Sequence, residues 1–227
     1  MRRELSVGDT LSEVFATYGA NAGVLLPVAF WLFLAVAIVD GLVGGNLALL
    51  PVTVLVSVVV GTLYQGMVVG LVRDVQDGRR DSSFGELFGY AAPVLLPLIG
   101  AGLLAGIGIG VGLVLLIVPG LFLMTIWAVI APVIVIERSG VIDAFTRSRE
   151  LVRGSGWPVF WTIIVAFLIA LAGSVVFGGI AASISNGWAV RIVFSALAQT
   201  ITAPISALVA AILYYRLQAL RSATAPT

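Results

Sequence analysis

A run of 47 residues without a charged side chain, Tyr90–Ile136, determines what kind of protein this chain forms. A helix that crosses the hydrocarbon core of a bilayer needs about 20 apolar residues. The run is therefore too long for one membrane helix and has the right length for two. Pro119 and Gly120 lie past its middle, and proline fits the first turn of a helix. We expect the break between the two helices within 112–120.

The composition of the whole chain excludes an ordinary soluble protein. Hydrophobic residues make up 60% of the 227 residues and charged residues 10%, and the mean hydropathy is +1.16. Four further apolar segments are long enough to cross a bilayer: Ala22–Val43, Leu47–Val72, Trp157–Ser185 and Ile192–Tyr215. The sequence predicts an all-α, polytopic membrane helix bundle of about six transmembrane helices, with residues 1–227 forming a single membrane domain.

The arginines predict how this bundle is oriented. Eleven lie before, between or after the spans on one side, and Arg191 alone lies on the other. Short loops rich in arginine face the cytoplasm, so both termini are expected there, in the plasma or inner membrane. Glu4, Asp9 and Glu13 interrupt the N-terminal region, which argues against a cleavable signal peptide. The eleven are Arg2, Arg3, Arg73, Arg79, Arg80, Arg138, Arg147, Arg149, Arg153, Arg216 and Arg221.

A short pattern recurs before each predicted pair of spans. Residues 10–15, 83–88 and 140–145 each read small, apolar, variable, acidic, apolar, Phe. The pattern predicts three units, each an interfacial helix followed by a hairpin, at about residues 6–72, 82–136 and 139–216. Thr10 with Glu13, and Ser83 with Glu86, have the spacing of a capping box, which favours a helix start at each place.

The third of these segments, residues 140–153, is the most amphipathic. Its apolar residues gather on one helical face and its charged residues on the other, and Asp143 has the i,i+4 spacing to Arg147. We expect this helix at the cytoplasmic interface, with Phe145 in the acyl boundary and arginines at the headgroups. It would close the bundle or bind lipid or a partner protein. The candidate interface residues are Phe145, Arg147, Arg149 and Arg153.

The same region carries a family resemblance. Val118-Pro119-Gly120, Ala131-Pro132, Glu137 and the run from Ala144 to Gly154 resemble the membrane domain of glycerophosphoryl diester phosphodiesterases and related uncharacterised six-helix membrane proteins. The distinctive part covers about residues 117–160, and the six-span layout extends the likeness over most of the chain. The resemblance implies a helical membrane module. It implies no phosphodiesterase activity, because the soluble catalytic domain is absent and the chain has no His.

Small residues at helical spacing predict where the spans pack together. They occur in four groups: Gly102, Gly106 and Gly110; Gly108 and Gly112; Gly66 and Gly70; and Ala166, Ala170, Ser174, Gly178 and Ala182. These faces would meet inside the bundle or between the chains of a homo-oligomer.

Polar residues inside the spans are the candidates for a functional site. Asp40 is an acid near the non-cytoplasmic end of the first span, where it could also reach interfacial water. Gln65 and Gln199 lie deeper, and Pro204 would loosen the sixth span near Gln199. The three could line a transport path. The two glutamines could equally form hydrogen bonds between helices.

Missing residue types exclude most enzyme chemistry. Without Cys, His or Lys there is no thiol nucleophile, no Ser-His-Asp triad and no Ser-Lys dyad, and zinc loses its favoured ligands. The remaining enzyme alternative is metal-dependent chemistry on a lipid headgroup, using acids and arginines between residues 73 and 86. We expect a non-enzymatic protein without a cofactor or nucleic-acid partner, which organises lipid or a partner protein. The alternative is a small-molecule or ion transporter or channel subunit.

Overall fold

The structure is a computed structural model that describes residues 5–43, 46–78, 83–184 and 187–224. Within these ranges it is helical and has no strand, as predicted. Arg2, Arg3, Glu4, Arg79 and Arg80, which entered the predictions above, lie outside the described residues, as does Asp81, one of the acids between residues 73 and 86. The elements are α1 (Val7–Val43), η1 (Leu47–Leu49), α2 (Leu50–Gln76), α3 (Phe84–Ala91), η2 (Ala92–Val94), α4 (Leu95–Leu115), α5 (Ile117–Ile126), α6 (Ile130–Glu137), α7 (Val141–Val152), α8 (Gly156–Ile184) and α9 (Trp188–Thr224).

Six helical stretches of the described residues are long and apolar enough to cross a membrane, which confirms the predicted polytopic bundle. Leu116 has extended backbone angles and separates α4 from α5, so the first break lies where Pro119 and Gly120 predicted it. The fourth span contains a second break that the sequence did not predict. It separates α5 from α6 at residues 127–129.

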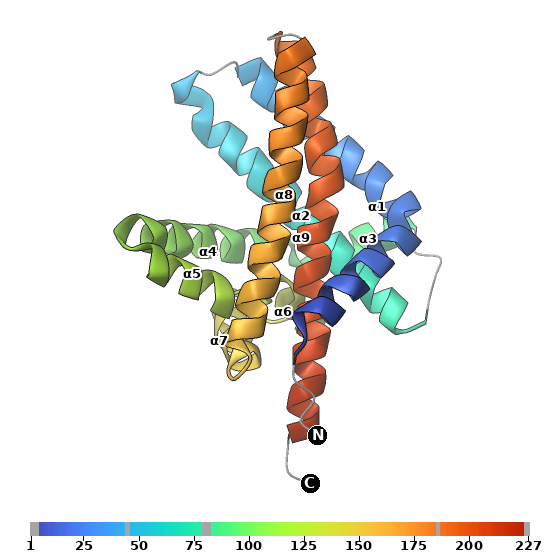
Figure 1. Ribbon diagram of the computed structural model, residues 1–227, viewed down its shortest axis with the longest axis vertical. Coiled ribbons are helices and arrows are strands. Elements are labelled where there is room, and N and C mark those ends of the chain that lie inside the picture. The colour runs from blue at the N-terminus through green and yellow to red at the C-terminus, as the bar shows by residue number, and fades with distance from the viewer. Residues whose placement is uncertain (1–4, 44–45, 79–82, 185–186, 225–227) are drawn as a thin grey trace.

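Helix α9 is the centre of the bundle. It packs most extensively against α1 and α8. In its most apolar stretch 72% of the residues are buried, against 6% in the corresponding stretches of α2 and α8. Figure 1 shows α8 and α9 as a long hairpin, with the α4–α5 hairpin pointing sideways from it.

The two ends of this bundle differ. At one end, named the terminal end here, α1 begins and α9 finishes, and Arg216 Nη2 lies 2.7 Å from Glu13 Oε2. The start of α1 and the finish of α9 lie toward the same end in Figure 1. The opposite end, where α8 finishes and α9 begins, is named the distal end.

The core lies toward the terminal end. All the buried residues of α2 fall between Tyr64 and Asp74, and none lies in its first half. The largest fully buried side chains of α9 are Leu208, Ile212, Leu213, Tyr214 and Leu217. In Figure 1 the first half of α2 diverges from the α8–α9 hairpin. The helices are therefore tightly packed at the terminal end and open toward the distal end.

The predicted starts of the short helices are partly corrected. Ser83 and Glu86 form the predicted capping box at the start of α3. Thr10 and Glu13 do not cap a helix, because α1 begins one turn earlier and Ser6 Oγ accepts a hydrogen bond from the Asp9 N–H. The first unit also has no separate interfacial helix, since α1 is continuous from Val7 to Val43. The threefold repeat stays a prediction.

Two of the predicted glycine faces are close helix contacts. A Cβ atom at Gly70 would lie 2.6 Å from Tyr90, and one at Gly112 would lie 2.9 Å from the Gly120 Cα. Gly106 and Gly110 face open space instead, because a Cβ atom at either position would have no atom within 4 Å. The α4–α5 hairpin therefore closes through Gly112 and Gly120, on the opposite face of α4.

Candidate functional site

One face of helix α7 packs against the bundle, and its other face is exposed. Ser148 is fully buried, and its hydroxyl donates to the Ile126 carbonyl at 2.9 Å. The same oxygen accepts from the Val129 N–H at 3.4 Å. These two backbone groups belong to the break between α5 and α6. A side chain of α7 thus takes the place of helical hydrogen bonds that the fourth span lacks there.

An ion pair and a tyrosine fix α7 to its neighbours at the terminal end. Arg147 Nε lies 3.1 Å from both carboxylate oxygens of Glu137, and the Tyr214 hydroxyl donates to Glu137 Oε1 at 2.9 Å. Burial lowers the pKa of Arg147. The hydrogen bond and the negative charge of Glu137 raise this pKa by more than burial lowers it, so the pKa lies above its ordinary value. Arg147 pairs with Glu137 and Glu150, and not with Asp143 as the i,i+4 spacing predicted.

The four predicted interface residues are therefore in different environments. Phe145 packs edge-to-face on Trp127, with ring centroids 4.8 Å apart, and its place at the acyl boundary stays a prediction. Arg147 is engaged by Glu137. Arg149 and Arg153 are exposed and available to headgroups or a partner.

The acids near residues 73–86 do not assemble a metal site among the described residues. No group of three His, Cys, Asp or Glu side chains that could hold a metal ion occurs there. Asp74 is buried and accepts from the Tyr90 hydroxyl at 2.8 Å. Asp77 lies 3.9 Å from Arg73 in an i,i+4 pair. The Tyr90–Asp74 hydrogen bond joins α3 to α2, whereas the Arg73–Asp77 pair lies at the end of α2 itself.

The distal half of α9 carries a stripe of polar side chains. Arg191, Ser195, Gln199, Thr202 and Ser206 follow one another at spacings of four, four, three and four residues. At 100° per residue they occupy one face of the helix. At 1.5 Å per residue the stripe extends about 22 Å from the distal end toward the middle of the bundle. We name these five residues the polar stripe.

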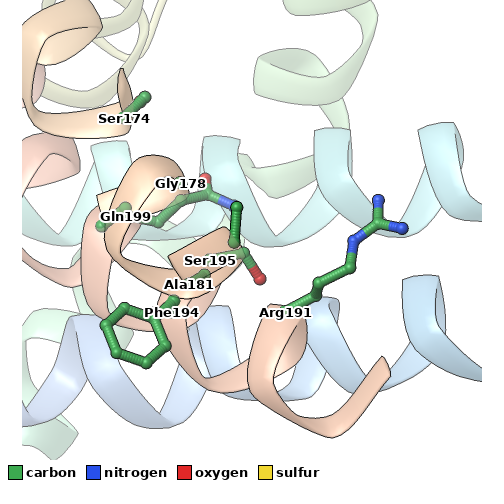
Figure 2. A pocket seen from close by; sticks show the side chains of 9 residues that line it. Ser174, Gly178, Ala181, Arg191, Phe194, Ser195 and Gln199 are labelled. Carbon is green, nitrogen blue, oxygen red and sulfur yellow. The ribbon is translucent and has the colours of Figure 1, made fainter. Parts of the chain in front are cut away.

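Two pockets open along the polar stripe and share Gln199. The outer pocket, about 700 Å³, lies between α8 and α9 and is lined by Arg191, Ser195, Gln199, Phe194 and small residues of α8. In Figure 2 Ser195 and Gln199 point to the same side of α9 as Arg191, and the Phe194 ring lies on the other side. The outer pocket thus combines a cation and polar groups with apolar walls.

The inner pocket, about 410 Å³, lies between α1, α2 and α9. It brings together Gln65 and Gln199, two residues that intramembrane polarity selected in the sequence, although 134 positions separate them in the chain. Ser57, Tyr64, Thr202 and Ser206 also line it. Toward the terminal end the fully buried Met67, Leu208 and Ile212 follow on α2 and α9. The inner pocket is therefore closed at that end by the core.

Three polar side chains that line these pockets have no protein partner among the described residues. Within the described residues, the side chains of Gln65, Gln199 and Arg191 take part in no hydrogen bond or ion pair. In hydrocarbon an amide that makes no hydrogen bond costs several kcal/mol, of the order of 2–7. Water or a polar part of a ligand must therefore satisfy them.

Asp40 is placed apart from this site. It is exposed near the distal end of α1 and lines neither pocket. The neighbouring Gly41 packs against Ile192, so Asp40 lies near the start of α9, yet it forms no ion pair with Arg191. The predicted trio is thus divided, with the two glutamines together and the acid outside.

Sequence reasoning missed three members of the polar stripe as site residues, although it had paired Thr202 with Gln199. Ser195 and Ser206 were not selected, and Arg191 was used only to orient the chain. The signal was present in the sequence as the spacing from Arg191 through Ser195 to Gln199, one helical turn at each step.

Comparison with known proteins supports the membrane assignment. The chain is 36% identical over 100 residues to a UPF0259 membrane protein from Pectobacterium carotovorum, a match that covers 44% of this chain and 39% of that relative. No protein-family model and no solved structure matches the chain. Similarity to an uncharacterised family of integral membrane proteins is thus supported. The resemblance to the phosphodiesterase membrane domain stays a prediction.

Proposed function

We propose that this is a non-enzymatic membrane protein that binds a lipid along the polar stripe of α9 and so organises lipid in the bilayer. The observation that carries the proposal is the position of unpartnered Gln199, Gln65 and Arg191 in pockets at the open, distal half of the bundle. A molecule with polar and apolar parts satisfies both the amides and the apolar walls of these pockets.

The open side of the pockets favours a lipid over a water-soluble ligand. The first half of α2 has no buried residue, and exposed apolar side chains such as Val54 and Leu55 continue along it. Apolar side chains of this kind are stable in contact with the acyl chains of lipids. A lipid can therefore approach the polar stripe from within the bilayer, whereas a soluble solute needs a path shielded from the acyl chains.

The excess of arginines on the side of the terminal end favours an orientation in which that end faces the cytoplasm. The pockets would then open toward the non-cytoplasmic leaflet, and the exposed Arg149 and Arg153 would meet headgroups of the cytoplasmic leaflet. The rigid attachment of α7 through Ser148 and Arg147 supports this second role, because it fixes the two arginines relative to the bundle. In this arrangement the protein contacts lipid in both leaflets.

Replacing Gln199 with leucine is expected to weaken retention of the bound lipid. An uncharged hydrogen bond contributes about 0.5–1.5 kcal/mol, which corresponds to roughly 2- to 10-fold in affinity. Native mass spectrometry of the protein extracted with its own lipids measures the retained lipid. Gln218→Leu is the matched control, since Gln218 is an exposed glutamine on the same helix at the terminal end. Retention that is equal in both variants, or no retained lipid in the original chain, contradicts the proposal.

Transport of a small polar solute is the second candidate function. It is favoured by one observation, the meeting of Gln65, Gln199 and Tyr64 in the inner pocket. Solute flux into vesicles that carry the original chain, lost in Gln199→Leu and kept in Gln218→Leu, would support transport in place of lipid organisation.

A further inference from the structure

We infer that the outer pocket selects a phospholipid with a net negative headgroup, whose phosphate binds Arg191 at the distal end of α9. This inference rests on the proposed lipid-binding function and names the class of lipid that the polar stripe takes.

The positive charge of the outer pocket favours a ligand with a negative charge. Of the described residues that line the two pockets, Arg191 alone is charged, and none is acidic. Its guanidinium is exposed and forms no ion pair within the described residues. Guanidinium binds phosphate oxygens through paired, charge-assisted hydrogen bonds. A headgroup that also carries an ammonium group would need an acidic partner, which the pocket lining does not supply.

The depth of the polar groups matches the order of groups along a phospholipid. Ser195 and Gln199 lie one and two turns deeper than Arg191, about 6 and 12 Å along the helix. In a phospholipid the ester carbonyls lie below the phosphate and accept hydrogen bonds. The Gln199 amide is a donor without a protein partner and is suited to those carbonyls. Exposed Trp188 at the start of α9 is the residue type typical of this interfacial level.

Small residues of α8 provide the space for the acyl chain. Ser174, Gly178, Ala181 and Ala182 form the α8 wall of the outer pocket. A Cβ atom at Gly178 would have no atom within 4 Å, so a larger side chain there enters the pocket without displacing the fold. Gly179 is equally unobstructed but does not line the pocket. These neighbouring glycines provide a matched pair of variants.

The test compares phosphatidylglycerol with phosphatidylcholine of the same acyl chains, added to delipidated full-length protein and followed by native mass spectrometry. The original chain is expected to prefer phosphatidylglycerol by about tenfold or more, because phosphatidylcholine brings a second cation beside the Arg191 guanidinium and the pocket lining has no acid to offset it. Arg191→Gln should lose the preference. Arg149→Gln, which removes an exposed arginine at the terminal end, should keep it. Gly178→Leu should lose the bound lipid, and Gly179→Leu should retain it.

The failures of the two proposals are distinguishable. Lipid that is retained without a headgroup preference, or a preference that survives Arg191→Gln, overturns the selection of an anionic lipid and leaves the lipid-binding function in place. No retained lipid of either type overturns both. Loss of phosphatidylglycerol on addition of millimolar glycerol 3-phosphate would show a soluble phosphate site and also overturns the inference.

Discussion

Gly120→Ala is expected to destabilise the protein by about 1–3 kcal/mol, the usual cost of overpacking a tight contact. A Cβ atom at Gly120 would lie 2.4 Å from Leu113 Cγ and 2.7 Å from the Leu113 backbone nitrogen. The backbone atom cannot move aside without shifting α4. The hairpin of α4 and α5 must therefore open, and both helices lose the close backbone approach that holds membrane helices together.

The matched control lies on the other face of the same hairpin. Gly106→Ala adds the same methyl group to α4 where no atom lies within 4 Å. It should be neutral or stabilising by up to about 1 kcal/mol, because alanine favours a helix more than glycine does. Reversible unfolding in mixed micelles, followed by tryptophan fluorescence, measures both changes. Equal effects of the two variants would mean that the Gly112–Gly120 contact does not hold the hairpin.

The sequence predicted those features that depend on local composition. Span positions follow from apolar length, and the break at Leu116 follows from Pro119 and Gly120. The capping box of Ser83 is likewise local, since donor and acceptor lie within one helical turn. At the start of α1 the same logic selected Thr10, although Ser6, four residues earlier, is the side chain that accepts the hydrogen bond. Two possible capping residues one turn apart gave an ambiguous signal.

Features that depend on distant partners could not be predicted. The break at residues 127–129 contains no proline or glycine, and two backbone groups there bond to Ser148, which lies 22 positions after Ile126. The edge-to-face contact of Phe145 could not be predicted for the same reason, because its partner Trp127 belongs to that break. A helical projection shows which face is apolar but not whether lipid or protein covers it.

The candidate site was predictable in part. Intramembrane polarity selected Gln65 and Gln199, which the structure places in one pocket. It also selected Asp40, which lies outside both pockets. Polarity alone does not distinguish a residue at the end of a helix from one that faces a hollow. The periodic stripe on α9 makes that distinction, since it places Gln199 on one face with four other polar side chains.

Ser148→Ala is expected to destabilise the protein by about 1–3 kcal/mol. The change removes the hydroxyl that donates to the Ile126 carbonyl and accepts from the Val129 N–H. Because Ser148 is fully buried, water does not replace it, and two backbone groups of the fourth span lose their partner. Thr146→Ala is the control, since Thr146 is exposed on the same helix and its hydroxyl bonds within that helix. Its effect should stay within about 0.5 kcal/mol.

Hydrogen exchange separates loss of the bridge from a general loosening of α7. If Ser148 supports the broken span, the amides of Trp127–Ile130 should exchange faster in Ser148→Ala, while those of α8 and α9 keep their protection. Uniform acceleration over the bundle would instead indicate a packing defect without a specific bridge. Unchanged exchange together with unchanged stability would mean that the break needs no support from α7. The position of Arg149 and Arg153 would then depend on the Arg147–Glu137 ion pair and the buried apolar face of α7 rather than on Ser148.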